Sequence, residues 1–276
     1  MNFKIFIFII TNNINNMSKN KIALICFKPN DIYLDFLNKF TNYEVYIIID
    51  DNSVNYALLY QQKYGINNKL KIVQMPDKIC KQYGFTNVNR IGVKKLISGW
   101  DKALCYFAFE GSNTDKIWFI EDDVFFHSEE ALLKIDAMYP DYDLLANCDF
   151  KPATNKNEWH WNYIDIKIPG PYYFGMMCAT RLSYYVLNRI RNYASIYKEL
   201  FFLEALFPTL SRANTGTKEL KCGCPNELKT VLYRYHHNDN QNNNNDNYDY
   251  TYDSISNKDN IYHPVKDILK HNEFRN

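Results

Sequence analysis

The chain has 276 residues, with 32 Lys and Arg residues against 31 Asp and Glu residues, so its formal net charge is +1. This balance excludes a protein whose main partner is a polyanion, because binding a phosphate backbone requires a basic excess. Aromatic residues make up 16% of the chain, which allows a large core and excludes general disorder. The length fits one large α/β domain or two small ones.

The first sixteen residues differ in character from those that follow. They hold one Lys and an apolar run that ends at Ile10, which resembles a signal peptide, but no small-residue cleavage site follows. A second Met stands at position 17. We expect translation to start there, or residues 1–16 to be a dispensable extension, with a secretory signal or weak anchor as the alternative. No apolar run approaches the roughly 20 residues of a membrane span.

Apolar runs of strand length alternate with helical patterns over the first half of the chain. Strands are predicted at 21–27, 45–49, 70–75, 116–120 and 143–148, and helices at 31–40, 91–109 and 128–139. Such alternation predicts βαβ units and a mostly parallel sheet, and continuously apolar strands are typical of a sheet covered on both faces. We therefore expect a single α/β domain with a Rossmann-like central sheet flanked by helices.

The alternation breaks down after about residue 150. A Trp- and Tyr-rich stretch around Trp159 is followed by a predicted strand at 172–179 and a helix at 181–197. Residues 238–250 are almost all Asn, Asp and Tyr, a composition that predicts a mobile loop. The predicted organisation is a domain at 17–235 with a nucleotide-type half at 17–150 and an elaborated half at 151–235, a mobile loop at 236–260, and a C-terminal segment at 261–276.

The seven cysteines form an odd number and stand mostly in apolar contexts. Free Cys in such contexts behaves as a small hydrophobe, so we expect a reducing compartment without a disulfide framework. This favours the cytoplasm, with the secretory pathway as the alternative if residues 1–16 act as a signal. Cys222 and Cys224, with His236 and His237 downstream, match no standard zinc spacing, and we interpret them as loop cysteines.

Carboxylates follow two of the predicted strands, at the edge where open α/β sheets bind ligands. They are Asp50 and Asp51 after the second strand, and Glu121, Asp122 and Asp123 after the fourth. Three adjacent acids repel one another unless a cation or hydrogen-bond donors stabilise them. Mg²⁺ and Mn²⁺ prefer carboxylate oxygens together with substrate phosphates. The pattern favours a site for a divalent metal and a diphosphate over a solvated acidic turn.

These two acidic strand ends resemble the GT-A class of nucleotide-sugar glycosyltransferases, and more narrowly its families 2 and 25, over about residues 21–208. The resemblance implies a GT-A-like fold in which Asp50 and Asp51 contact the nucleoside. It implies that the second strand end is the DXD element, which binds the metal that bridges the donor diphosphate. A strict Asp-X-Asp is absent here. Either Glu121 or Asp122 acts with Asp123, which we expect to be the direct metal ligand.

Two later features fit the same resemblance. Glu204 lies in an apolar stretch, and burial would raise its pKa toward the range of a catalytic base, as in inverting members of the class. His263 follows the Asn-rich loop and would complete the metal shell, while Lys266 would meet the diphosphate. The alternatives are an exposed Glu on an amphipathic helix and a surface His that precedes a helix with Pro at its first position.

Basic and aromatic residues provide further candidates. Arg90 or Lys102 would balance the donor phosphates, although each of these, like Lys94 and Lys95, is alternatively a solvated helix charge. The flat rings around Trp159 and at 172–174 offer surfaces on which sugars stack, or else they pack in the core.

The resulting prediction is a metal-dependent glycosyltransferase. It uses Mn²⁺ or Mg²⁺ and moves a sugar from a nucleotide-sugar, with a UDP-sugar favoured, to a hydroxyl of a glycan or protein, with inversion. Nucleic-acid binding is not expected, because the charge is neutral and no zinc-finger or helix-turn-helix spacing appears. The alternatives are a nucleotidyltransferase of similar fold and an inactive binding module. The Asn-rich composition is typical of an AT-rich genome, such as that of a protist or a large DNA virus. The oligomeric state stays open.

Overall fold

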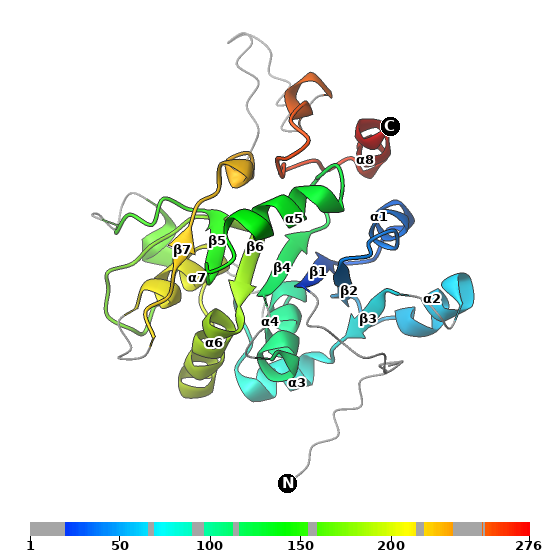
Figure 1. Ribbon diagram of the computed structural model, residues 1–276. Coiled ribbons are helices and arrows are strands. Elements are labelled where there is room, and N and C mark those ends of the chain that lie inside the picture. Colours follow the sequence, from blue (N-terminus) through cyan, green and yellow to red (C-terminus); the bar gives the residue numbers. More distant parts are fainter. Residues whose placement is uncertain are drawn as a thin grey trace, which may run out of the picture.

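The computed structural model describes residues 20–65, 69–89, 97–112, 116–153, 159–213, 218–233, 250 and 252–276. A seven-stranded sheet forms its centre, in the order β3-β2-β1-β4-β6-β5-β7 (Figure 1). The strands are β1 (Asn20–Cys26), β2 (Tyr43–Ile49), β3 (Lys71–Gln74), β4 (Lys116–Glu121), β5 (Leu144–Asn147), β6 (Met176–Ser183) and β7 (Cys222–Gly223).

The sheet is mostly parallel, as the sequence predicts. β1 pairs in parallel with β2 on one side and with β4 on the other, and β2 pairs in parallel with β3. β6 runs antiparallel to both β4 and β5, and β5 is parallel to β7. In the described sheet β6 is therefore the one reversed strand, and it lies directly beside β4.

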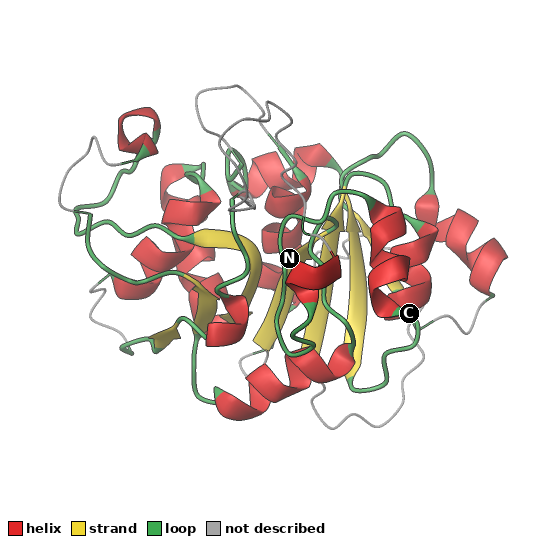
Figure 2. Cartoon of the chain, turned by 90° about the horizontal axis from the view of Figure 1, so that it is seen from above, coloured by secondary structure: helices red, strands yellow, loops and turns green. Residues whose placement is uncertain are grey.

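Helices cover both faces of this sheet, as Figure 2 shows from above. The described α-helices are α1 (Asp31–Leu37), α2 (Tyr56–Tyr64), α3 (Asp77–Tyr83), α4 (Gly99–Glu110), α5 (Glu129–Met138), α6 (Tyr184–Tyr197), α7 (Leu203–Arg212) and α8 (Ile268–Arg275). Successive residues of β4 point to opposite faces. Phe119 belongs to the buried cluster that includes residues of α3, α4, α6 and α7, whereas Trp118 belongs to the one that includes residues of α1, α2 and α5. This two-sided burial explains why the strands are continuously apolar.

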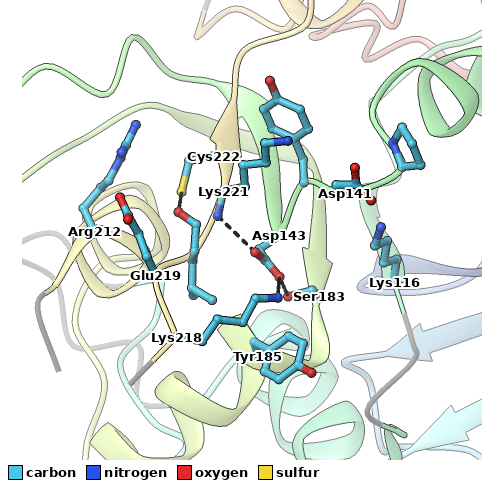
Figure 3. A pocket seen from close by; sticks show the side chains of 13 residues that line it. Lys116, Asp141, Asp143, Ser183, Tyr185, Arg212, Lys218, Glu219, Lys221 and Cys222 are labelled. Carbon is cyan, nitrogen blue, oxygen red and sulfur yellow. Dashed lines mark hydrogen bonds and ion pairs between the residues drawn. The ribbon is translucent and has the colours of Figure 1, made fainter. Parts of the chain in front are cut away.

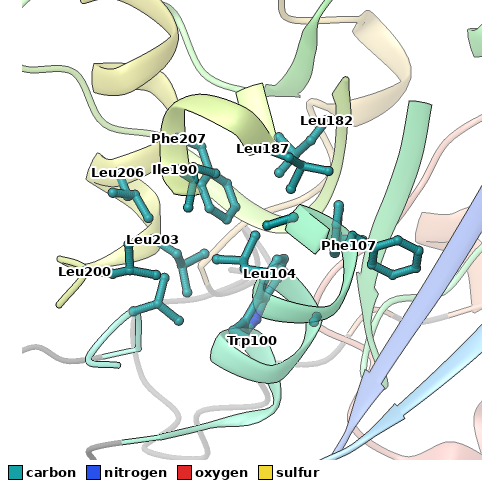
Figure 4. Packing of buried hydrophobic residues seen from close by; sticks show 14 of the residues in the cluster. Trp100, Leu104, Phe107, Leu182, Leu187, Ile190, Leu200, Leu203, Leu206 and Phe207 are labelled. Carbon is teal, nitrogen blue, oxygen red and sulfur yellow. The ribbon is translucent and has the colours of Figure 1, made fainter. Parts of the chain in front are cut away.

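The cluster on the α4 face is the larger of the two. Leu104 and Trp100 of α4 meet Ile190 of α6 and Phe207 of α7 there (Figure 4). The indole of Trp100 also stacks near the Phe119 ring, with centroids 6.0 Å apart. This packing fixes α4 and α7 against the sheet, so residues at their N-terminal ends are held in place.

Several predicted element boundaries differ from the structure. The helix predicted at 91–109 begins at Gly99, because Ser98 and Asp101 form a capping box that starts a helix there. The strand predicted at 172–179 and the helix predicted at 181–197 are both displaced, since β6 continues to Ser183. Helix α2 is not apparent from the sequence pattern, because Tyr60 is its one buried residue in the structure.

The C-terminal segment returns to the end of β4. Phe125 and Tyr262 exchange backbone hydrogen bonds of 2.8 Å in both directions, and the amide of Val265 donates to the carbonyl of Asp123 at 2.8 Å. Helix α8 packs on α1, where the guanidinium of Arg275 lies 3.5 Å from the centre of the Phe36 ring. The last residues are thereby tied to the loop that carries the predicted metal ligands.

Two further expectations concern cysteines and membranes. All seven cysteines are free thiols, and five of them are buried. Among the described residues, no helix is both long and apolar enough to cross a membrane.

Candidate active site

The strand order places a topological switch point at the carboxyl ends of β1 and β4. The chain proceeds from β1 outward to β2 and β3, then returns to the other side of β1 with β4. In open α/β sheets, ligands bind outside the carboxyl ends of the strands at such a switch point. The two acidic strand ends predicted from the sequence, at 50–51 and at 121–123, flank this point.

Three potential metal ligands converge beside the end of β4. Glu121 is the last residue of β4, Cys178 lies on the neighbouring strand β6, and His263 comes from the C-terminal segment. Their ligand atoms all lie within 4.8 Å of one another. Sequence reasoning proposed Glu121 and His263 but missed Cys178, because a Cys in an apolar run gives no signal that distinguishes a ligand from a core residue.

His263 is held firmly in its orientation. Its backbone amide donates to the carbonyl of Thr230 at 3.1 Å, and its carbonyl accepts from the amide of Leu232 at 3.0 Å. The ring atom Nδ1 lies 2.5 Å from the Leu232 carbonyl oxygen. Since a carbonyl only accepts, Nδ1 carries a proton and donates it. This hydrogen bond directs Nε2 toward the acidic strand end, the arrangement common in metal-binding histidines.

Asp123 faces that nitrogen atom. Its Oδ1 is buried and lies 3.2 Å from Nε2 of His263, and no described residue makes a well-directed hydrogen bond to this oxygen. Burial works to raise the pKa of Asp123, but His263 and Lys266 outweigh it, so the pKa is lowered. Burial likewise works to lower the pKa of His263, but Asp123 and Glu121 raise it overall. The two groups form a partly buried ion pair at the site.

The remaining acids at this strand end have raised pKa values. Burial, followed by the charge of Asp123, raises the pKa of Glu121, although Trp100 donates a hydrogen bond of 2.5 Å to Glu121 Oε1. Burial, Asp123 and Glu121 together raise the pKa of Asp122 to about 6. The nearby His263 and Lys266 do not cancel the mutual repulsion of these carboxylates, and a bound cation would add positive charge there.

Glu204 belongs to the same electrostatic cluster. It lies in the first turn of α7, and burial followed by the charge of Glu121 raises its pKa to about 7, while His263 opposes the rise. A helix N-terminus stabilises a carboxylate by about 0.3–1 kcal/mol, which is less than one pKa unit, so burial dominates. The structure thus brings Glu204 together with Glu121 and His263, and the partly buried carboxyl titrates near neutral pH.

The residues present fit a bound divalent cation. Four acidic groups gather at this point against the positive charges of His263 and Lys266, and no described residue makes a well-directed hydrogen bond to the buried Oδ1 of Asp123. Carboxylate oxygens and an imidazole nitrogen suit Mn²⁺ or Mg²⁺. Asp123, Glu121 and His263 are the residues that would hold the ion.

Lys102 does not have the environment predicted for it. Its ammonium group is buried on α4 and lies 2.5 Å from the backbone oxygen of Asp50, 3.1 Å from Asp50 Oδ1 and 3.0 Å from Asp77 Oδ1. A lysine that is surrounded by acceptors and hidden from solvent is not positioned for donor phosphates. It instead fixes Asp50, at the end of β2, to the start of α3.

Asp51 is held by an independent set of donors. Its carboxylate accepts hydrogen bonds from the Ser53 amide at 2.9 Å, the Ser53 hydroxyl at 2.8 Å and the Tyr56 hydroxyl at 2.8 Å. These bonds lower its pKa to about 2, so Asp51 is fully ionised at neutral pH. The neighbouring Phe27, just beyond the end of β1, is 61% exposed. The sequence analysis did not single out this ring, whose exposure at the switch point becomes visible only in the fold.

Aromatic side chains gather near Glu204. The rings of Trp159 and Phe174 are stacked with centroids 4.8 Å apart, and Phe202 lies 5.9 Å from Trp159. Gly175 connects this group to α7, since its amide donates to the Glu204 carbonyl at 3.0 Å. Phe174 remains 39% exposed, so the cluster is partly core and partly surface.

Three predicted basic residues, Arg90, Lys94 and Lys95, lie outside the described residues. Lys266 is exposed, and its charge lowers the pKa of Asp123, which places it near the metal-ligand cluster.

A pocket of about 670 Å³ lies at the opposite edge of the sheet, around Lys116 at the start of β4 and Ser183 at the end of β6 (Figure 3). Its central carboxylate, Asp143, accepts hydrogen bonds from the Ser183 hydroxyl at 2.9 Å and the Lys221 amide at 3.0 Å. Lys218 lies 3.6 Å from the same carboxylate. The full length of β4 separates this pocket from the acidic strand end at 121–123.

No protein-family model and no curated protein matches the chain. Among solved structures, the chain is similar to the apo form of mouse xyloside xylosyltransferase 1, with 10% sequence identity and a TM-score of 0.38. The similarity covers 75% of this chain and 84% of that chain. Because identity and TM-score are both low, no functional inference is taken from it. The narrower resemblance to families 2 and 25 stays a prediction.

Proposed function

We propose that the protein is a metal-dependent glycosyltransferase that uses a nucleotide-sugar donor. The observation that carries the proposal is the convergence of Glu121, Asp123 and His263 beside Glu204, a carboxyl group with a pKa of about 7. A set of metal ligands next to a group able to exchange a proton near neutral pH matches what transfer to a hydroxyl requires.

The acidic end of β4 would hold Mn²⁺ or Mg²⁺. Asp123, Glu121 and His263 are the ligands, and Asp122 lies close enough to contribute charge. When bound, the ion would neutralise negative charge on the departing diphosphate. Lys266, exposed beside Asp123, would add a positive charge on the solvent side of the same group.

The carboxyl ends of β1 and β2 would hold the nucleoside. Asp51 is ionised and fixed by Ser53 and Tyr56, and Asp50 is fixed by Lys102, so both offer acceptors for ribose hydroxyls or base N–H groups. The exposed ring of Phe27 offers a face for stacking on the base. A UDP-sugar is the favoured donor, on the resemblance alone.

Glu204 would act as the general base. In its ionised form it accepts the proton of an acceptor hydroxyl, whose oxygen then attacks the anomeric carbon, and this course gives inversion. The exposed ring of Phe174, stacked with Trp159, would contact the acceptor. We propose a glycan or a protein as the acceptor, no nucleic-acid partner, and the cytoplasm as the location.

Two other functions remain as alternatives. A nucleotidyltransferase would typically carry a Gly-rich loop with a basic residue after the first strand. Here the connection from β1 to α1 spans residues 27–30, with Lys28 but no Gly. A binding module without activity would retain the fold but would not need a carboxyl group with a pKa near 7 beside the metal ligands.

The test is nucleotide-sugar turnover by residues 17–276, with and without Mn²⁺, across UDP-, GDP- and CMP-sugars. We expect slow, Mn²⁺-dependent release of one nucleotide, and loss of that release in Asp123→Asn. Asp141→Asn serves as the matched control, because that side chain is exposed and precedes β5, beside the pocket around Lys116 at the opposite edge of the sheet.

Different outcomes separate the alternatives. Metal-dependent turnover of free nucleoside triphosphates, with no release from sugars, would favour the nucleotidyltransferase. Nucleotide-dependent rise of the melting temperature without any turnover would favour the binding module. Full activity of Asp123→Asn would refute the metal assignment.

A further inference from the structure

We propose that Glu121, Cys178 and His263 form a binding site for a thiophilic divalent cation of the Zn²⁺ class, and that this site overlaps the one for the catalytic ion. The cation-binding part stands on the geometry of these three side chains. Its consequence for activity, inhibition of turnover by zinc, rests on the proposed function.

The chemistry of the ligand set favours a softer metal than Mn²⁺ or Mg²⁺. Hard ions bind oxygen, whereas thiolate sulfur selects Zn²⁺ and similar ions. A site with one sulfur, one imidazole nitrogen and one carboxylate oxygen contains the three donor types that zinc uses in proteins. A site built for Mg²⁺ alone would gain nothing from Cys178 at this position.

The geometry allows a single ion to contact all three residues. Ligands about 2.0–2.3 Å from a tetrahedral zinc ion are separated from one another by about 3.5 Å. The ligand atoms of Glu121, Cys178 and His263 lie within 4.8 Å of one another, so small side-chain movements suffice. Oδ1 of Asp123 is 3.2 Å from His263 Nε2 and has no well-directed hydrogen bond from the described residues, so it can provide the fourth ligand.

The imidazole is already prepared for a metal. Nδ1 of His263 donates to the Leu232 carbonyl at 2.5 Å, which leaves Nε2 as the atom that faces Asp123. Such a second hydrogen bond fixes the tautomer and the ring orientation of a ligating His. Trp100 orients Glu121 in the same way, through a hydrogen bond of 2.5 Å to Oε1.

The two metals cannot be bound at once. Glu121 and His263 are shared between the proposed zinc set and the proposed Mn²⁺ set, and Cys178 is the residue that distinguishes them. Zinc bound to Cys178 would therefore also occupy Glu121 and His263, so these two side chains could not bind the catalytic ion. Free zinc would compete with Mn²⁺, and the outcome would depend on the ratio of the two ions.

The first test uses Co²⁺ as a spectroscopic substitute for zinc in the full chain. Thiolate ligation gives a sulfur-to-cobalt charge-transfer band in the near ultraviolet, which oxygen and nitrogen ligands do not give. We expect the band in the unmodified protein and its loss in Cys178→Ser. Cys224→Ser is the control, because Cys224 is a partly exposed thiol outside the cluster. Absence of the band, or its loss in Cys224→Ser instead, would overturn the proposal.

A second measurement needs no variant, in case Cys178→Ser does not fold. X-ray absorption at the zinc edge of the unmodified protein with one equivalent of Zn²⁺ should show one sulfur neighbour at about 2.3 Å. A shell of oxygen and nitrogen only would refute the site. For a folded Cys178→Ser, zinc affinity should fall by about 100-fold or more, since loss of even an outer partner of a ligand costs about 10–100-fold.

The activity measurement separates this inference from the proposed function. Zinc should inhibit Mn²⁺-dependent turnover, excess Mn²⁺ should restore it, and Cys178→Ser should need about 100-fold more zinc for half inhibition. A thiolate band without any turnover would keep the zinc site and reject the transferase. Turnover without a thiolate band would keep the transferase and reject the zinc site.

Discussion

His263 Nε2 lies 3.2 Å from Oδ1 of Asp123, so a side chain near the C-terminus faces the acidic end of a central strand. In the protein without metal, each group partly compensates the charge of the other. A divalent cation would replace this pair by binding to both. The ion pair therefore keeps the two proposed metal ligands close together, which would reduce the ordering that metal binding requires.

Replacing Glu204, the proposed general base, should make the protein more stable and less active. The folded protein holds a proton on Glu204 with a pKa of about 7, against an ordinary value of 4.5. Between these values the folded state binds the proton and the unfolded state does not, so stability falls as pH rises through this range. Glu204→Gln lacks this penalty. At pH 8 we expect the free energy of unfolding of this variant to exceed that of the unmodified protein by up to about 3 kcal/mol.

The comparison is made by urea unfolding in the presence of a chelator at pH 8 and pH 4. At pH 4 the gain should vanish, because both states of the unmodified protein are then protonated. The same variant should lose turnover with Mn²⁺. A variant that is inactive but equally stable at both pH values would show that burial does not raise the pKa of Glu204.

The pH dependence of turnover provides a second test of the same group. If ionised Glu204 is the base, kcat/KM should rise about tenfold per pH unit below the pKa and level off above it. The raised pKa places this limb below about pH 7, rather than below the 4.5 of an ordinary Glu. A rate that is constant from pH 5.5 to pH 8 would exclude Glu204 from proton transfer in the limiting step.

Lys102 should matter for stability far more than a surface lysine does. Its buried ammonium lies between Asp50 and Asp77. Lys102→Met removes this ammonium, and with it the counter-charge that Lys102 provides for Asp50. Loss of one partner of a buried pair typically costs 3–5 kcal/mol, and the exposure of Asp77 reduces this to about 3. Lys63→Met breaks an exposed pair with Asp31 and should cost under about 1 kcal/mol.

Unfolding of both lysine variants by denaturant gives the comparison. Equal stabilities would mean that Lys102 is not the structural link that its contacts indicate. In that case the earlier prediction, contact with donor phosphates, would become the better explanation for a lysine at this edge.

A methyl group at Gly175 should disturb the Glu204 side of the site. An added Cβ would lie 2.5 Å from Cys148 Cβ and 2.8 Å from the Asn147 carbonyl oxygen, closer than atoms pack. Gly175→Ala therefore forces the backbone apart and should cost about 1–3 kcal/mol. At Gly170 the nearest atom would be 3.5 Å away, so Gly170→Ala should be close to neutral. The melting temperatures of both variants test this. A lower melting temperature for Gly175→Ala alone is expected if the backbone at Gly175 lies as close to Cys148 and Asn147 as the structure places it.

The fold and the acidic strand ends could be predicted because their signals are local. An uninterrupted apolar run such as 116–120 indicates a strand buried on both faces, and the acids that follow it fall at the ligand edge of a parallel sheet by topology alone. The positions of these acids in the structure agree with that prediction. Capping is local too, but the Ser98–Asp101 box was overlooked, so the predicted helix began too early.

The remaining parts of the site depend on contacts between distant segments. Nothing in the sequence near Lys102 shows that two aspartates from other elements surround it, so its burial could not be foreseen. Cys178 reads as one more small apolar residue of β6, and its meeting with Glu121 follows from the antiparallel pairing of β6 beside β4. Phe27 becomes notable only because the fold leaves its ring exposed at the switch point.

The backbone exchange between Phe125 and Tyr262 means that the metal-ligand set is assembled late in synthesis. All seven strands of the described sheet precede residue 224, so a nascent chain can form them before His263 leaves the ribosome. A frameshift or stop codon between residues 250 and 261 would encode the whole sheet but lack this ligand. Its product would retain every described strand but lose the proposed ligand His263 and the core residues that Ile261 and Tyr262 contribute.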